Sequence, residues 1–152
     1  MKKEDDSVPA SSAQIDRTRA RAWALQVHYQ WDVSNGDNSL VEILDKVLAT
    51  RRVATARIPY MKRIASGLDR YGDQVDDGLN SVLQNWRLDR LSVIDRAILR
   101  IAALEMLYFK DIPPKVSIYE GIRIAELYGG TESPAFVNGV LDALMTGIGQ
   151  IS

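Results

Sequence analysis

The chain contains no cysteine and only one histidine among its 152 residues. Without cysteine it forms no disulfide, holds no thiolate-bound metal and has no cysteine nucleophile. A single histidine excludes the paired histidines of the common zinc motifs, and no Gly-x-x-x-x-Gly-Lys phosphate loop occurs. These absences argue against an enzyme and predict no metal and no other cofactor.

Long apolar runs are missing as well. No segment approaches the roughly 20 apolar residues that cross a bilayer, and the polar, acidic start of the chain does not resemble a secretion signal. A cytoplasmic protein without membrane contact is therefore expected. The apolar fraction of 46 % and the charged fraction of 26 % are ordinary for a soluble globular protein. The length suits a single domain with a sizeable core.

Positive and negative charges nearly balance, since the formal net charge is −1. This argues against a general nucleic-acid coat protein. The charges are nevertheless segregated: residues 17–31 hold three arginines and no acid, and residues 46–68 hold six cations and no acid. Four aspartates gather between residues 69 and 77 and are expected to begin a solvated helix. With its charges segregated in this way, the chain could bind a short RNA. The alternative is that the charged runs are only the solvated faces of helices.

The spacing of apolar residues predicts helices over most of the chain and no strands. Residues 1–13 are expected to form a flexible tail, and residues 14–152 a single helical domain. The seven predicted helices cover about residues 14–33, 40–48, 59–71, 74–86, 93–108, 115–128 and 134–146. The predicted N-caps are Ser39, Ser92 (with Asp95) and Ser133. Gly72 and Gly129 are expected to end helices, and Trp86 to face inward.

Three blocks of sequence resemble the NusB family of bacterial transcription antitermination factors. They read ALQVHYQWD at 24–32, WRLDRLSVIDRAILR at 86–100, and DIPPKVSI followed by SPAFVNGVLD between 111 and 142. They lie in the family's order, and the resemblance spans about residues 17–144. It implies an all-α, compact seven-helix NusB-like fold built from two packed helical bundles, which binds RNA and a ribosomal protein.

In the family, the arginine-rich start of the first helix contacts RNA phosphates. The matching residues are Arg17, Arg19 and Arg21, while Thr18 stands where a further basic residue is common. At about 100° per residue, Arg17, Arg21 and His28 share one side of the helix. A surface helix with scattered arginines is the alternative, since phosphate contacts need cations but no particular register. His28 replaces the usual leucine and is expected to be satisfied or half-buried.

The start of the last helix is a second predicted RNA site. Phe136 can stack on a base, Asn138 can bond a base edge, and free backbone N–H groups can meet a phosphate. Core packing is the alternative, and we accept it for Val137. Ala135 replaces a lysine that is common in the family, which removes one candidate phosphate contact.

The resemblance also implies a protein partner, the ribosomal protein NusE. The matching residues are Tyr29, Asp89 and Asp95, of which Asp95 also suits a helix cap. We expect a transcription antitermination factor that binds boxA-type single-stranded RNA of nascent ribosomal RNA together with NusE and couples it to RNA polymerase. An RNA-independent helical protein-binding scaffold and a ribosome-assembly factor are the alternatives. The sequence leaves the oligomeric state open, a homodimer included.

Overall fold

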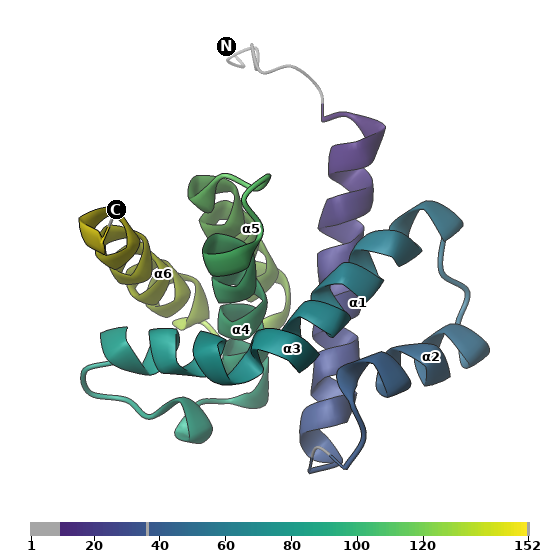
Figure 1. The fold of residues 1–152 in the computed structure, drawn as a ribbon, viewed down its shortest axis with the longest axis horizontal. Coiled ribbons are helices and arrows are strands. Elements are labelled where there is room, and N and C mark those ends of the chain that lie inside the picture. The colour runs from purple at the N-terminus through teal and green to yellow at the C-terminus, as the bar shows by residue number, and fades with distance from the viewer. Residues whose placement is uncertain (1–9, 36, 152) are drawn as a thin grey trace.

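The computed structural model describes residues 10–35 and 37–151, and over these residues the chain is all-α without a strand (Figure 1). The α-helices are α1 (Ser12–Val33), α2 (Leu40–Thr50), α3 (Ile58–Val82), α4 (Val93–Tyr108), α5 (Pro114–Tyr128) and α6 (Ser133–Ile151). Two 3-10 helices, η1 (Thr55–Arg57) and η2 (Leu88–Arg90), precede α3 and α4. The all-α class is confirmed. The predicted seven helices are one too many, since this part of the chain forms six α-helices.

The helix count differs because α3 continues through Gly72. A glycine inside a helix costs about 1 kcal/mol, but contacts on both sides of Gly72 hold the helix against α4. Tyr71 stacks on Tyr108 with ring centroids 4.0 Å apart. Asp76 accepts two hydrogen bonds, of 2.9 and 3.0 Å, from Arg100. Packing against α4 therefore outweighs the intrinsic weakness of glycine.

The segment after α3 also differs from the prediction. The helix ends at Val82, so Trp86 lies in a loop with 59 % of its surface exposed instead of facing inward. The four clustered aspartates lie inside α3 and do not begin a helix. Asp69 accepts hydrogen bonds from the backbone N–H groups of Leu40 and Val41 at 2.8 and 3.1 Å. It therefore caps the start of α2 from a neighbouring helix.

Capping serines set three helix starts. Ser39 and Ser92 each accept a hydrogen bond from the backbone N–H three residues later, as predicted. Helix α1 begins two residues earlier than expected because Ser11 and Gln14 form a reciprocal capping box. Most of the predicted flexible tail, residues 1–9, lies outside the described residues.

A tight corner joins α5 to α6. Helix α5 ends at Tyr128 before Gly129, as predicted. A side chain at position 129 would lie 2.6 Å from the Cβ of Ser133, so only glycine fits the corner. Ser133 is not the predicted N-cap: it is the first residue of α6, and its hydroxyl accepts a hydrogen bond from the Gly130 N–H. Helix α6 continues past the predicted end to Ile151.

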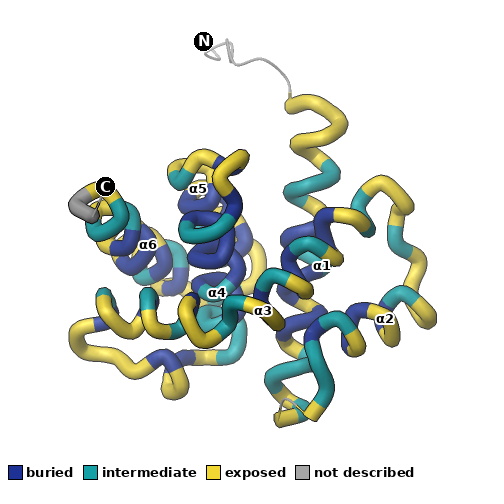
Figure 2. The backbone as a smooth tube through the Cα atoms, viewed as in Figure 1, coloured by how far each residue is buried: buried dark blue, intermediate teal, exposed yellow. Residues whose placement is uncertain are grey.

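The helices form two groups that share one core (Figure 1). Helices α1, α2 and the first half of α3 pack together, and the second half of α3 packs with α4, α5 and α6. This agrees with the two expected bundles. Helix α4 is central and buried over most of its length, whereas the first turns of α1 are exposed (Figure 2). In the described part of the chain, no helix is long and apolar enough to cross a membrane.

Candidate functional site

The candidate residues gather at the two ends of α4, along which α1 runs in the opposite direction. Near the C-terminal end of α4, Arg21 of α1 pairs with Glu105 at 2.7 Å. Near the N-terminal end, Asp32 of α1 pairs with Arg96 at 2.8 Å. Helix α4 has 16 residues and is therefore about 24 Å long at 1.5 Å per residue. The two ends present separate surfaces.

Arg21, predicted to contact RNA, is buried with only 3 % of its surface exposed. Its guanidinium lies 2.7 Å from Glu105 and 3.5 Å from Glu120, and the Tyr60 hydroxyl donates to the same Glu105 carboxylate. Burial alone would lower the pKa of Arg21, but Glu105, Tyr60 and Glu120 together offset it and the pKa is raised. Burial, with Glu105 beside it, also raises the pKa of Tyr60. Because two acids enclose it, Arg21 is not available to an RNA phosphate.

The basic surface, which we define by Arg17 and Arg63, lies over this buried cluster, whereas Arg19 lies about 200° around α1 from Arg17. Arg19 is exposed and forms no ion pair within the described residues. Arg17 lies 5.1 Å from the centre of the Tyr60 ring and donates to Asp111 at 3.4 Å. Arg63 of α3 donates to the same carboxylate at 2.6 and 3.0 Å. The sequence did not single out Arg63, although it belongs to the run of cations in residues 46–68.

At the other end of α4, His28 is buried beside Arg100. Its Nε2 lies 3.2 Å from a guanidinium nitrogen of Arg100. Burial, and then the charge of Arg100, lower the pKa of His28 to about 3. The neutral imidazole therefore accepts a hydrogen bond through Nε2, while Nδ1 has no hydrogen-bond partner among the residues that the structure describes. The histidine is fully buried and satisfied at one nitrogen only.

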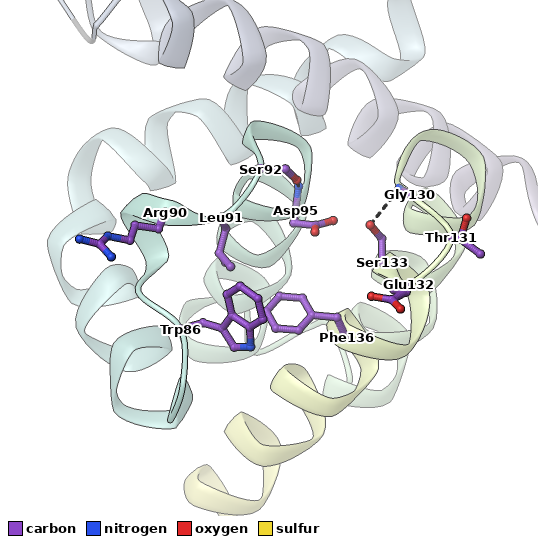
Figure 3. Close-up of a pocket in the computed structure, with 10 residues that line it drawn as sticks. All are labelled: Trp86, Arg90, Leu91, Ser92, Asp95, Gly130, Thr131, Glu132, Ser133 and Phe136. Atoms are coloured by element: carbon purple, nitrogen blue, oxygen red, sulfur yellow. Dashed lines mark hydrogen bonds between the residues drawn. The ribbon is translucent and has the colours of Figure 1, made fainter.

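A pocket of about 560 Å³ opens beside the N-terminal end of α4 (Figure 3). Its lining comes from the loop after α3, the start of α4 and the turn into α6: Trp86, Arg90, Leu91, Ser92, Asp95, Gly130, Thr131, Glu132, Ser133 and Phe136. The rings of Trp86 and Phe136 meet edge to face, with centroids 6.0 Å apart. Figure 3 shows Arg90 pointing away from these rings. One carboxylate oxygen of Asp95 is buried without a hydrogen-bond partner.

Sequence reasoning missed Trp86 as a pocket residue. No signal separated it from a core position, because Trp86 continues the helical spacing of Leu79 and Leu83. The loop that exposes it becomes visible only in the structure. We call Tyr29, Trp86, Asp89, Asp95 and Phe136 together the aromatic surface.

The structure brings Phe136 together with Asp95, and not with the arginines of α1 that were predicted to bind RNA. Phe136 is half-buried, lines the pocket and donates its backbone N–H to the Glu132 carbonyl, so this N–H is not free for a phosphate. Asn138 is exposed but lies about 200° around the helix from Phe136 and does not line the pocket. Val137 is fully buried, which confirms the core assignment. The predicted RNA-binding residues therefore fall on different surfaces.

The residues predicted to contact a protein partner lie around the same end of α4. Tyr29 is 45 % exposed, one turn before Asp32 on α1. Arg96 binds the Asp32 carboxylate and also donates to the backbone carbonyl of Asp89 at 3.3 Å. Asp89 is exposed on η2, and Asp95 lies on the first turn of α4. Within the described residues, no cluster of acids or histidine is arranged to hold a metal ion.

Comparison with known proteins shows the family of the chain. The sequence model of the NusB family matches residues 18–146. The chain is 37 % identical to the transcription antitermination protein NusB of Methylacidiphilum infernorum, over 90 % of this chain and 94 % of that protein. It is 39 % identical to the same protein of Bacillus subtilis, over 90 % and 99 % of the two chains.

Two solved structures are similar to this one. NusB of T. maritima matches with a TM-score of 0.76 and 36 % identity, covering 86 % of this chain and 90 % of that chain. NusB in the crystal structure of antitermination factors NusB and NusE with double-stranded RNA matches with a TM-score of 0.77 and 25 % identity, covering 88 % and 98 %.

Proposed function

The chain belongs to the NusB family of transcription antitermination factors, and we propose that it binds the boxA element of nascent ribosomal RNA together with the ribosomal protein NusE. The complex couples this RNA to elongating RNA polymerase by recognition alone, without a chemical step. A relative of similar fold has been crystallised with NusE and double-stranded RNA, which supports both partners.

The observation that carries the proposal is that the two ends of α4 expose different kinds of side chain. The basic surface offers guanidinium groups, which bind phosphates and position an RNA without reading its sequence. The aromatic surface offers rings that can stack on bases. The carboxylate of Asp95 lies in the same pocket as these rings. An RNA whose phosphates lie along the first surface can present bases near the second, where the protein partner also binds.

Individual residues take the following roles in the proposed complex. Arg17 and Arg19 bind phosphates, and Phe136 stacks on a base. Asn138 bonds a base edge from the exposed side of α6, outside the pocket. NusE contacts residues near the start of α4, namely the exposed Tyr29 and Asp89 and the partly buried Asp95. Arg21 is left out because it is buried against two carboxylates.

The experiment is a titration of fluorescent boxA-type single-stranded RNA, with and without NusE. The substitution Asp95→Lys should weaken NusE binding about tenfold or more, which is at least about 1.4 kcal/mol, and leave binding of RNA alone unchanged. Asp77→Lys, at an exposed position of α3, is the control for charge. A folded Asp95→Lys protein with normal affinity for NusE would place the interface elsewhere.

A second candidate function is an RNA-independent protein-binding scaffold. It is favoured by the absence of a basic excess, since the net charge is −1, and by the burial of Arg21. The same titration separates the two functions. Binding of NusE without any binding of RNA at moderate salt would support the scaffold and overturn the proposal.

A further inference from the structure

A carboxylate lies at the centre of the basic surface. Asp111, three residues beyond the end of α4, accepts hydrogen bonds of 2.6 and 3.0 Å from Arg63 and of 3.4 Å from Arg17. The two arginines come from α3 and α1, so three separate elements meet at this side chain. All three side chains remain between 39 % and 47 % exposed. An anion in solution can therefore reach the two guanidinium groups.

Aromatic rings hold these guanidinium groups independently of Asp111. The Arg63 guanidinium lies 3.9 Å from the centre of the Phe109 ring, and that of Arg17 lies 5.1 Å from the Tyr60 ring. The two rings meet edge to face, with centroids 6.1 Å apart. The Tyr60 hydroxyl also donates to the buried Glu105. Cation–π contacts on such a fixed platform keep both arginines in place when the carboxylate is removed.

Asp111 resembles a bound anion in its charge and its geometry. Hydrogen bonds from Arg63 lower the pKa of Asp111 to about 2, so the carboxylate stays charged near neutral pH. Protonation therefore does not release the arginines, and only another anion can replace the carboxylate. A phosphodiester presents two oxygens to a guanidinium fork with the same bidentate geometry as a carboxylate.

We propose that Arg17 and Arg63 form a phosphate site for RNA, in which Asp111 occupies the position of the phosphate until RNA displaces it. This inference rests on the RNA binding proposed above. It adds Arg63 as a phosphate ligand and Asp111 as a built-in competitor. The competition lowers the affinity of the protein for RNA below the value that its exposed cations would allow.

The test is the substitution Asp111→Asn, which keeps the size of the side chain and removes its charge. It should tighten binding of boxA-type single-stranded RNA on the order of three- to tenfold at low salt. It should also steepen the dependence of log K on log salt by about 0.7, the value for one additional phosphate bound by the protein. Asp77→Asn is the matched control, because it changes the net charge equally and lies 14 residues beyond Arg63 on α3, about 21 Å along the helix.

Combined substitutions test whether the tighter binding of Asp111→Asn depends on the arginines that contact Asp111. In an Arg17→Gln, Arg63→Gln background, Asp111→Asn should no longer tighten RNA binding, because both guanidinium groups that it frees are absent. Tighter binding that survives in this background overturns the inference, as does an Asp111→Asn protein that binds RNA no tighter than Asp77→Asn. A lower melting temperature of Asp111→Asn without any increase in RNA affinity also overturns the inference. Asp111 would then only stabilise the packing of the three elements.

Arg19→Gln separates failure of the inference from failure of the proposed function. Arg19 is exposed on the same helix as Arg17 but does not contact Asp111. If Arg19→Gln weakens RNA binding while Asp111→Asn behaves like its control, the inference fails and the proposed function stands. If the wild-type protein binds no RNA, both fail.

Discussion

The two ends of α4 are joined to α1 by ion clusters of opposite polarity, buried at the C-terminal end and partly exposed at the N-terminal end. At the C-terminal end, α1 supplies the cation Arg21 and α4 supplies Glu105. At the N-terminal end, α1 supplies Asp32, and α4 supplies Arg96 and Arg100. In both pairs the acid lies toward the C-terminus of its helix, where the helix dipole disfavours it by roughly 0.3–1 kcal/mol. Pairing between the helices, and not the stability of either helix alone, therefore explains these charges.

The exposed residues over the two clusters differ in kind. Above the C-terminal end lie the guanidinium groups of the basic surface, and around the N-terminal end lie the rings and carboxylates of the aromatic surface. The charged groups of each cluster pair mainly with one another, so we do not expect either cluster to bind a ligand. The difference between the two surfaces therefore lies in their exposed side chains, and each surface can be tested without disturbing the other.

The largest expected effect comes from breaking the buried cluster at the C-terminal end. Glu105→Ala leaves Arg21 buried without its nearest carboxylate and should lower the free energy of unfolding by about 3–5 kcal/mol. Urea denaturation measures this loss. Arg63→Gln, which breaks an exposed pair at the same end, is the control and should cost less than about 1 kcal/mol. Equal losses of unfolding free energy in the two variants would show that the Arg21 side chain becomes solvent-exposed when Glu105 is removed.

The cluster at the N-terminal end should be sensitive to pH through His28. Its pKa is about 3 in the folded protein against an ordinary value of 6.5, so the unfolded chain takes up the proton first. Stability is complete above pH 6.5 and falls as the pH drops toward 3. At pH 5 the loss from this group is about 2 kcal/mol, at 1.36 kcal/mol per pH unit.

His28→Leu removes this component of the pH dependence. Denaturation of both proteins at pH 7 and pH 5 should show a smaller loss of stability in the variant. Parallel losses in the two proteins would mean that His28 does not titrate as its burial beside Arg100 requires.

On the aromatic surface, Trp86→Ala should weaken RNA binding by about 1–3 kcal/mol, the usual contribution of one ring that stacks on a base. Because Trp86 is 59 % exposed in a loop, the free energy of unfolding should change by less than about 1 kcal/mol. Trp86→Phe keeps a ring and should retain most of the affinity. Normal RNA binding by a folded Trp86→Ala protein would remove this residue from the RNA site.

The smallest expected effect concerns the exposed arginines at the start of α1. Replacing Arg17 and Arg19 by glutamine should flatten the dependence of log K on log salt by about 1.4, at about 0.7 for each phosphate contact to a single strand. Arg51 and Arg52, which are exposed after α2, provide a control pair with the same change of charge. If the control pair flattens the slope equally, RNA is attracted by overall charge and not by the start of α1.

Several features that depend on neighbouring residues were predicted correctly from the sequence, although the capping box at Ser11 and the place of Ser133 in α6 were not. The caps at Ser39 and Ser92 involve groups only three residues apart, and the end of α5 at Gly129 depends on an equally local corner. The continuation of α3 through Gly72 was not predicted. It depends on Arg100, which is 24 residues from its partner Asp76, and no local pattern contains that contact.

The sequence by itself determined the all-α class, the family and most helix starts, because apolar periodicity, caps and family blocks are properties of short segments. Only the tertiary structure decided which arginine of α1 can meet a ligand. Arg17 and Arg21 lie on the same side of the helix, one turn apart. Arg21 is buried because Glu105, 84 residues later in the chain, packs against it, whereas Arg17 lies beyond that contact at the exposed start of the helix.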